Sequence, residues 1–312
     1  MESRKSGAFD LKVLLVIGVV VAAVVGFMAG YFVGSASQPE TLSIVDDYGR
    51  NVHLSGVAER IVSVSPTPTE ILFAIGAGSQ VVGVDDYSDY PADTANLTKV
   101  GSYTLNLEVI ISLEPDLIVC SDLVPRAQLD QLATQQGIPY FIFATRTMED
   151  VYKDIRLAGG ITGHTTEADQ LVSSLQTRVD AVTSKTLAAN VTKPRVYIEY
   201  YPLWTYGPGS FGDDLIRLAG GENIAANASN EYPELTSEYI IAQDPEVIVY
   251  TIGPMTMTTE AEISGRAGWS GITAVATDNI YSIDDNLLSR YGPRIVDGFE
   301  QLAEMIHPEL FS

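Results

Sequence analysis

The feature that most constrains this chain is an uninterrupted helical pattern over residues 165–190. The stretch contains no Gly or Pro, and Leu171, Leu175, Val179 and Val182 recur at steps of three and four residues. This spacing predicts one long amphipathic helix. At about 1.5 Å per residue, the helix would be roughly 40 Å long, which is the span of a small domain. A helix of that length predicts a stiff connection between two parts of the protein.

The segments on either side of this helix resemble each other. Residues 108–120 read EVIISLEPDLIVC and residues 238–250 read EYIIAQDPEVIVY, so Glu, Ile-Ile, Pro and Ile-Val fall at the same offsets. Arg60 and Arg195 begin similar apolar runs further upstream. One copy is far longer than the unit of a solenoid protein, which is about 20–50 residues. The repeat therefore predicts two related lobes.

Each predicted lobe alternates short β-prone runs with helical patterns. We expect an N-terminal α/β lobe over residues 46–164 and a C-terminal α/β lobe over residues 191–312, joined by the long helix. Alternation of this kind predicts Rossmann-like lobes with parallel sheets covered by helices on both faces. In such sheets, ligands bind outside the carboxyl ends of the strands.

The N-terminal region has the pattern of a membrane segment. Residues 13–34 carry no charge and follow a basic stretch, and at helical rise they would cover about 33 Å, enough to cross a bilayer. The basic flank predicts a cytoplasmic N-terminus within residues 1–34, and an extracytoplasmic location for everything beyond the linker at residues 35–45. A cleaved signal peptide, ending near residues 34–37, remains the alternative. No cysteine follows the apolar run, which argues against lipid attachment there.

Charge and composition exclude several classes of function. The net charge of −22 argues against nucleic-acid binding, which needs a basic surface. Cys120 is the only cysteine, so an internal disulfide or a multi-cysteine metal site is excluded. His53, His164 and His307 have no partner at metal-ligand spacing, and we expect all three on the surface of a monomer without a metal site or a cofactor.

Tyrosines concentrate in the loops expected at the carboxyl ends of the strands. Seven of the sixteen tyrosines fall in these loops. Aromatic rings with polar tips, carried on loops above a rigid scaffold, favour a wide, flat and partly polar ligand. The loops are residues 65–69, 85–91, 101–104, 200–207 and 284–293.

The chain lacks the motifs of common catalysts. It has no G-x-S-x-G elbow, and its single cysteine has no placed histidine. Residues 207–212 match G-x-G-x-x-G, but Asp213 and Asp214 follow where a pyrophosphate would need free N–H groups. An α/β enzyme acting on a nucleotide or sugar is a remote alternative that lacks an acid–base pair. We therefore expect a binding protein and not an enzyme.

Glu108 and Glu238 stand at equivalent positions, each at the start of a predicted helix. One interpretation is a glutamate that caps the helix or interacts favourably with its dipole. The other is a pair of exposed carboxylates that the two lobes present to paired arginines on a two-fold symmetric partner. The sequence leaves both open.

Several stretches resemble a known family. The chain from about residue 46 onward is similar to the helical-backbone substrate-binding proteins of ABC importers for vitamin B12, iron siderophores and haem. Within that family, the runs Tyr87-Ser-Asp-Tyr-Pro91 and Asn106-Leu-Glu108 look most like the cobalamin-binding members. The stretches that carry the resemblance are residues 60–66, 69–76, 81–91, 106–108, 115–119, 219–223 and 291–294.

The resemblance implies an extracytoplasmic receptor that delivers its solute to an ABC permease dimer with ATPase subunits. It implies that Glu108 and Glu238 dock on arginines of the permease. It also places five residues near a corrinoid: Tyr87, Tyr103, Trp204, Asp285 and Arg290.

Two departures from the cobalamin-binding pattern keep other ligands open. Ser121 stands where those members have a tryptophan, and Asn286-Leu287 replaces an aromatic residue. A ferric siderophore or haem receptor of the same family is therefore the alternative.

Overall fold

The computed structural model describes residues 41–188, 192–253, 256 and 258–311. Leu42–Ser312 form one compact unit, and the account below concerns it. The predicted membrane segment at residues 13–34 lies outside the described residues. Among the helices that are described, none combines the length and the apolar character needed to cross a membrane.

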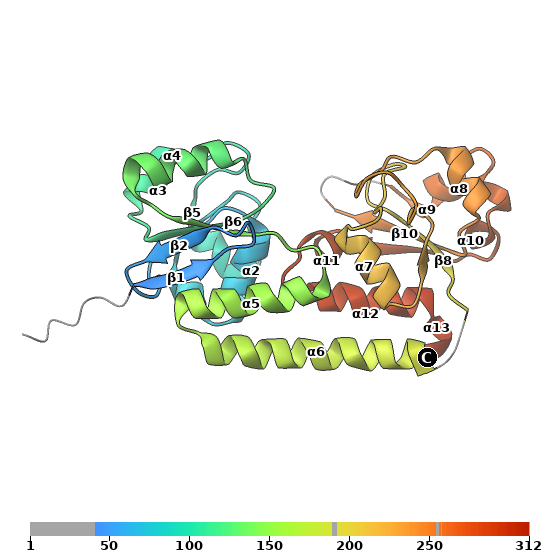
Figure 1. Ribbon diagram of the computed structural model, residues 1–312. Coiled ribbons are helices and arrows are strands. Elements are labelled where there is room, and N and C mark those ends of the chain that lie inside the picture. Colours follow the sequence, from blue (N-terminus) through green and yellow to red (C-terminus); the bar gives the residue numbers. More distant parts are fainter. Residues whose placement is uncertain (1–40, 189–191, 254–255, 257, 312) are drawn as a thin grey trace, which may run out of the picture. The chain divides into compact units, whose positions relative to one another are not determined.

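The N-terminal lobe contains a five-stranded parallel sheet with the order β5-β4-β3-β6-β7, and a two-stranded hairpin precedes it (Figure 1). The hairpin consists of β1 (Leu42–Val45) and β2 (Asn51–Leu54). The sheet strands are β3 (Ile61–Ser63), β4 (Val81–Val84), β5 (Thr98–Lys99), β6 (Leu117–Ser121) and β7 (Tyr140–Phe143). The helices are α2 (Pro66–Ala74), α3 (Leu107–Ser112), α4 (Arg126–Gln136) and α5 (Met148–Thr162).

The C-terminal lobe has a four-stranded parallel sheet with the order β11-β10-β8-β9. Its strands are β8 (Arg195–Glu199), β9 (Glu222–Asn223), β10 (Val247–Ile252) and β11 (Ile280–Asp284). Its helices are α7 (Phe211–Leu218), α8 (Ser237–Gln243), α9 (Glu260–Ser264), α10 (Thr273–Ala276), α11 (Asn286–Ser289), α12 (Ile295–Ile306) and α13 (Pro308–Phe311). The prediction of an α/β fold with parallel sheets is confirmed.

The internal repeat is visible in the strand order. The order β4-β3-β6-β7 in the first lobe matches β9-β8-β10-β11 in the second. One corner also repeats in detail: Arg60 Nε donates to the carbonyl of Glu114 at 3.1 Å, and Arg195 Nε donates to the carbonyl of Asp244 at 2.9 Å. Glu114 and Asp244 both adopt a left-handed backbone, with φ of 48° and 46°, which is uncommon outside glycine. The repeat therefore preserves a specific turn as well as a pattern.

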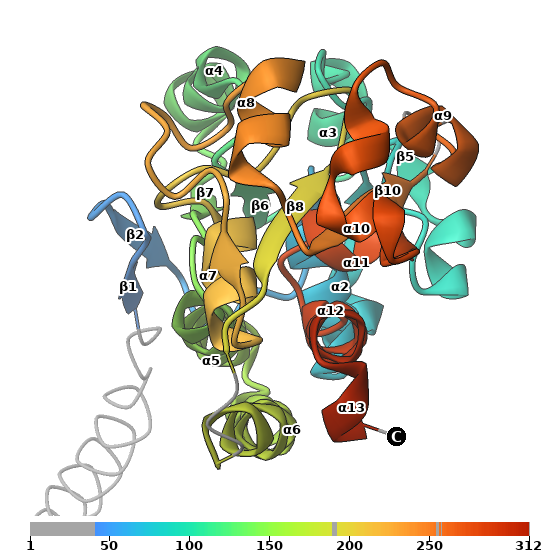
Figure 2. The same ribbon diagram turned by 90° about the vertical axis from the view of Figure 1, so that its right-hand side faces the viewer.

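The predicted long helix is α6 (Thr165–Ala188), which packs against α5 and α12 (Figures 1 and 2). The sequence pattern placed Leu171 in the buried stripe, but that residue is half-buried at the edge and Val172 takes its place. The residues buried along α6 are Ala168, Val172, Leu175, Val179, Val182 and Thr186. Because this stripe faces core elements of both lobes, α6 ties the lobes together along one side.

A glycine permits the close approach of α5 and α6. A Cβ added at Gly159 would lie 2.6 Å from the Cβ of Ala168, which is closer than two carbon atoms can pack. Gly163 then ends α5 with a left-handed φ of 78°, so the chain can reverse directly into α6.

The structure corrects the expectation for His307. Its residue exposure is only 1%, because the end of α12 packs into the C-terminal lobe. Its ring lies within hydrogen-bonding distance of the Gly220 carbonyl, at 3.3 Å, and of the Glu309 carboxylate, at 3.2 Å. Within the described part of the chain, no group of His, Cys, Asp and Glu residues has the arrangement of a metal site.

Candidate ligand-binding cleft

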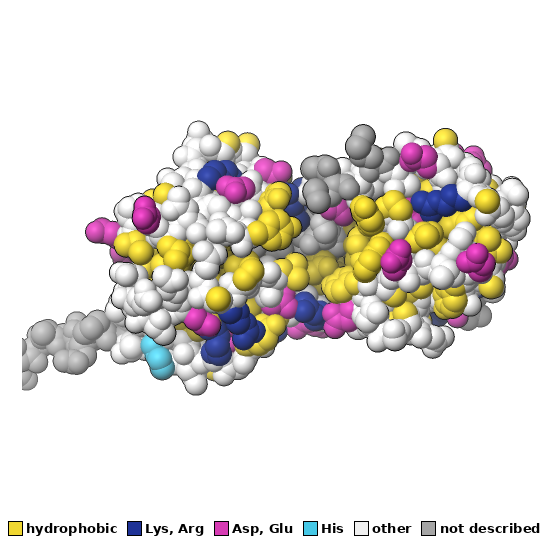
Figure 3. Space-filling view, turned by 90° about the horizontal axis from the view of Figure 1, so that it is seen from above, with side chains coloured by type: hydrophobic (Ala, Val, Ile, Leu, Met, Phe, Trp, Pro, Cys, Tyr) yellow, Lys and Arg dark blue, Asp and Glu magenta, His cyan; other side chains and the backbone are white. Residues whose placement is uncertain are grey.

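A cleft of about 700 Å³ lies between the two lobes, where segments that follow the strands of both sheets meet. Seen from above, hydrophobic side chains flank a hollow between the two halves (Figure 3). The residues that line the cleft are Ser65, Pro66, Thr67, Tyr87, Tyr103, Ser121, Asp122, Leu123, Phe143, Thr145, Arg146, Tyr200, Tyr201, Tyr206, Tyr232, Thr256, Asp285, Asn286, Ser289, Arg290 and Tyr291. Nearly all of them follow the carboxyl ends of strands, as expected for parallel α/β sheets.

Tyrosines dominate both walls of the cleft. On the N-terminal wall, the rings of Tyr87 and Tyr103 meet edge to face at 6.0 Å, and their exposed fractions are 51% and 76%. On the C-terminal wall, the rings of Tyr200, Tyr206 and Tyr232 form a cluster with centroid distances between 5.1 and 6.4 Å. Flat aromatic faces with polar edges suit a broad ligand that carries many hydrogen-bonding groups.

The phenols of Tyr200 and Tyr206, on the C-terminal wall, are neutral at physiological pH. Burial raises the pKa of Tyr200 to about 12, and burial raises the pKa of Tyr206 further above its usual value. A neutral phenol both donates and accepts hydrogen bonds, so these two tyrosines offer polarity without charge.

A buried polar network holds the loop that carries Tyr87. Asp85 accepts hydrogen bonds from the backbone N–H of Tyr87 at 3.1 Å and from the Ser88 hydroxyl. Lys99 Nζ donates to the carbonyls of Asp85 at 3.1 Å and Ser88 at 2.7 Å. Thr69 Oγ1, on α2, lies 2.9 Å from the Ser88 hydroxyl. These bonds fix the backbone of the loop while the Tyr87 ring remains exposed.

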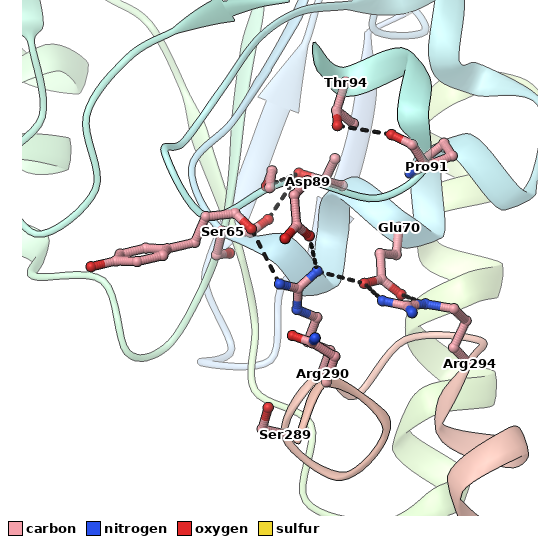
Figure 4. Close-up of polar contacts among 12 residues, drawn as sticks. Ser65, Glu70, Asp89, Pro91, Thr94, Ser289, Arg290 and Arg294 are labelled. Carbon is pink, nitrogen blue, oxygen red and sulfur yellow. Dashed lines mark hydrogen bonds and ion pairs between the residues drawn. The ribbon is translucent and has the colours of Figure 1, made fainter. Parts of the chain in front are cut away.

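Charged residues connect the lobes at one edge of the cleft (Figure 4). Glu70, on α2, is 2% exposed. Its carboxylate accepts two hydrogen bonds from Arg294, one from Nε at 2.9 Å and one from Nη2 at 2.5 Å. Arg290 Nη1 lies 3.3 Å from the same carboxylate and 2.5 Å from Asp89 Oδ1. Two guanidinium groups of the C-terminal lobe therefore surround a buried carboxylate of the N-terminal lobe.

The structure brings together four of the five residues expected near the ligand. Tyr87, Tyr103, Asp285 and Arg290 all line the cleft. Trp204 is not among the described lining residues; it is half-buried and forms antiparallel bridges with Tyr201 and Glu234. It follows the lining pair Tyr200-Tyr201, and the chain turns away from the cleft before reaching it.

Asp285 is the carboxylate of the C-terminal wall. Burial raises its pKa, although the carboxylate accepts a hydrogen bond from the Ser289 hydroxyl at 3.2 Å, which acts in the opposite direction. Asn286 and Ser289 line the cleft beside it. This corner offers hydrogen-bond acceptors and donors to a ligand.

Sequence reasoning missed several lining residues. Tyr200, Tyr201, Tyr206 and Tyr291 lie in loops that the sequence singled out, but no pattern marked them individually. Tyr232 follows none of the predicted strands directly, so it carried no signal at all.

Glu108 and Glu238 occupy matching positions on α3 and α8. Both are exposed, and their helices are capped by other side chains: Asn106 accepts from the Val109 N–H at 3.2 Å, and Thr236 accepts from the Tyr239 N–H at 3.2 Å. Asn106 and Thr236 therefore cap these two helices, and the glutamates do not. The favourable interaction of each glutamate with its helix dipole remains.

Two parallel α/β sheets, a long helix that ties them and an aromatic cleft between them are the architecture of two-lobed solute-binding proteins. The sequence profile of the periplasmic binding protein family matches residues 61–287. The chain therefore belongs to this family, whose members are solute-binding receptors of ABC importers and not enzymes. This confirms the family resemblance seen in the sequence.

Individual relatives agree with this assignment. The chain is 32% identical over 278 residues to the ABC transporter substrate-binding lipoprotein YvrC of Bacillus subtilis, covering 86% of this chain and 87% of YvrC. The periplasmic vitamin B12 binding protein BtuF of Vibrio cholerae superposes with a TM-score of 0.69 at 27% identity, covering 80% of this chain and 97% of BtuF. The haem-binding protein RhuT of Roseiflexus superposes with a TM-score of 0.71 at 26% identity, covering 81% and 99%.

Proposed function

We propose that this protein is the extracytoplasmic receptor of an ABC importer and captures a corrinoid in the cleft between its lobes. The observation that carries the proposal is the cleft of about 700 Å³ with tyrosines on both walls. A corrin ring is broad and flat and bears many peripheral amides. Aromatic faces pack against such a ring, and neutral phenols exchange hydrogen bonds with amides. The vitamin B12 binding relative supports the same ligand.

A haem or ferric siderophore is the second candidate. The similarity to a haem-binding protein favours it, as does the exposure of Tyr87 and Tyr103, whose phenols could approach a metal centre. The carboxylates of Asp122 and Asp285 in the cleft argue against this candidate, since haem and many ferric siderophores are anionic.

Calorimetric titration of the full-length protein in detergent, with cyanocobalamin, haemin and a ferric hydroxamate, tests the ligand. We expect saturable binding of cyanocobalamin with a Kd below about 1 μM, or roughly −8 kcal/mol. Replacing Tyr87 and Tyr201 together by Ala should weaken it at least about tenfold, because each removes aromatic contact area from one wall. Binding of haemin or the ferric complex alone would replace the corrinoid as the ligand.

The receptor would dock on its permease through one surface of each lobe. Glu108 and Glu238 lie on these surfaces, each followed three residues later by an isoleucine on the same side of its helix. Ile111 and Ile241 are 37% and 36% exposed. A carboxylate beside an apolar side chain, repeated in both lobes, suits two matching sites on the permease dimer.

Stimulation of the permease ATPase in proteoliposomes tests the docking surface. We expect the combined Glu108→Ala and Glu238→Ala variant to reduce stimulation at least about tenfold, since each lost charge-assisted pair is worth about 1.5–3 kcal/mol. Glu149→Ala is the matched control, because Glu149 is also exposed in the first turn of a helix, α5. Equal stimulation by both variants would leave Glu108 and Glu238 with a helix-dipole role only.

The proposal includes a membrane anchor at residues 13–34 that keeps lobes 46–164 and 191–312 outside the cell. N-terminal sequencing of protein purified from membranes tests it. An intact N-terminus is expected, and a start near residues 35–38 would instead identify a cleaved signal peptide.

A further inference from the structure

The cationic side chains of the cleft are already occupied by carboxylates of the protein itself. Among the described lining residues, Arg146 and Arg290 carry the only positive charges. Arg290 Nη1 lies 2.5 Å from Asp89 Oδ1, and Arg146 Nη2 lies 2.5 Å from Asp122 Oδ2. A guanidinium group is the usual partner of an anionic ligand, and here each one is paired before a ligand arrives.

Arg290 is the more completely satisfied of the two. Its side chain is only 12% exposed, and besides Asp89 it approaches Glu70 at 3.3 Å and donates to the Tyr87 carbonyl at 3.3 Å. Figure 4 shows its guanidinium group between Asp89 and Glu70. The Arg290 hydrogen bond lowers the pKa of Asp89, so this carboxylate stays ionised and paired at neutral pH.

Asp89 differs from Glu70 in one respect that matters for a ligand. The Asp89 side chain is 70% exposed, whereas that of Glu70 is 1% exposed. Glu70 therefore belongs to the connection between the lobes, while Asp89 is a solvent-exposed partner of Arg290, which itself lines the cleft. Displacing Asp89 would leave its charge beside the ligand, which repels an anion.

The other charged residues of the cleft also disfavour an anionic ligand. Arg146 is paired with Asp122 and lies 3.8 Å from Glu231. Asp285 lines the cleft and receives a hydrogen bond from Ser289. Once the two arginines are paired, no other described lining residue carries a positive charge for an anion.

We propose that Asp89, with Asp122 in a smaller role, makes the cleft selective against anionic ligands by occupying its two guanidinium groups. The selectivity rests on the proposed function and narrows its substrate class to neutral or cationic flat ligands. A corrinoid whose side chains are amides meets this requirement. A porphyrin or ferric complex with free carboxylates or catecholates does not.

Two matched pairs of ligands test the selectivity by calorimetry on the full-length protein. The first pair is cyanocobalamin and its monocarboxylate, in which one peripheral amide is hydrolysed. The second pair is the dimethyl ester of haemin and haemin itself. For whichever pair binds, we expect the wild type to prefer the less anionic member by at least about tenfold, or about 1.4 kcal/mol. In Asp89→Asn the preference should fall to within about twofold.

Asp86→Asn is the matched control, since Asp86 is exposed in the same loop and removing it changes the net charge equally. It should keep the wild-type preference. Asp122→Asn should reduce the preference less than Asp89→Asn, because the Arg146 side chain is 36% exposed and Glu231 remains beside it. Equal effects of Asp86→Asn and Asp89→Asn would overturn the proposal, because general charge and not the Arg290 pair would then be responsible.

A readout that needs no solute completes the test. Inorganic pyrophosphate should raise the melting temperature of Asp89→Asn and leave that of the wild type and Asp86→Asn unchanged, because only the first lacks the negative charge of Asp89 beside Arg290. The same shift in all three would overturn the proposal.

The outcomes separate the selectivity from the ligand. Equal binding of cyanocobalamin and its monocarboxylate by the wild type would overturn the selectivity and leave the corrinoid assignment standing. Preference for the haemin ester without any corrinoid binding would do the reverse.

Discussion

Each lobe contains a carboxylate that is almost fully buried, Glu199 in the C-terminal lobe and Asp154 in the N-terminal lobe, but the two are held very differently. In the C-terminal lobe, Glu199 accepts hydrogen bonds from Arg266 at 2.6 and 2.7 Å and from the Tyr197 hydroxyl at 2.8 Å. In the N-terminal lobe, Asp154 accepts one hydrogen bond at 2.7 Å, from Thr145, a lining residue of the cleft. Both carboxylates are at most 1% exposed.

The difference lies in what faces the second oxygen. Asp154 Oδ1 is buried and has no hydrogen-bond partner among the described residues, while Lys153 Nζ stands 3.9 Å away. That ammonium group is shared with Asp47 at 2.9 Å and Asp150 at 3.1 Å. Burial and the neighbouring charge of Asp47 raise the pKa of Asp154 to about 8. A fully paired buried carboxylate is a fixed structural element, whereas an under-paired one responds to pH.

The largest effect is expected on the C-terminal side. Glu199→Ala should lower the free energy of unfolding by about 3–5 kcal/mol, because it leaves the Arg266 guanidinium, whose side chain is 21% exposed, without its counter-charge. Urea denaturation followed by circular dichroism measures this. Glu222→Ala, an exposed position on β9, should change stability by less than about 0.5 kcal/mol. Similar losses in both variants would contradict the structural role of the Glu199–Arg266 pair.

In the N-terminal lobe, replacing the buried carboxylate of Asp154 should preserve or increase stability at pH 8, whereas replacing Glu199 lowers it. Because the folded-state pKa of Asp154 is raised to about 8 from a usual value of 3.8, the folded protein holds a proton between these pH values that the unfolded chain has released. Stability should therefore fall as pH rises through this window, by up to about 1.4 kcal/mol per pH unit, and level off above it. Asp154→Asn should remove this fall and equal or exceed the wild type in stability at pH 8.

Denaturation midpoints of the wild type and Asp154→Asn, measured from pH 4 to pH 9, decide the matter. Parallel pH profiles would mean that Asp154 is ionised throughout and that its pairing with Lys153 is stronger than the geometry indicates. Glu199→Gln measured over the same range separates this effect from a general response of buried acids.

The smallest effect concerns the corner that the lobes share. Arg60→Ala and Arg195→Ala should each cost about 1 kcal/mol, because each removes hydrogen bonds from a charged side chain to two carbonyls at the end of a helix. Arg195 also lies 3.3 Å from Asp244 and 3.4 Å from Glu246, so its loss should exceed that of Arg60 by less than about 1 kcal/mol. Thermal denaturation measures both, and a difference of several kcal/mol would show that the repeat is not energetically equivalent.

Local sequence patterns predicted much of the framework. The period of apolar residues marked α6, and the alternation of β-prone runs with helical patterns predicted the parallel sheets of both lobes. The repeated segments at residues 108–120 and 238–250 predicted two related lobes, and the strand orders of the two sheets match. These features follow from spacing along the chain, because a helix or a strand buries residues at fixed intervals.

Most of the cleft's electrostatics could not be predicted in this way. The pairing of Arg290 with Asp89 and Glu70 joins residues about two hundred positions apart, and the orphaned oxygen of Asp154 depends on how α5, β7 and the hairpin turn pack. Trp204 shows the same limit, since only the course of its loop carries it away from the cleft lining. The sequence by itself determined the α/β lobes, the connecting helix and most of the loops that line the cleft, because hydrophobic periodicity is local. Only the tertiary structure decided which charges meet, because a pKa or an ion pair depends on distances and burial set by the packing of distant segments.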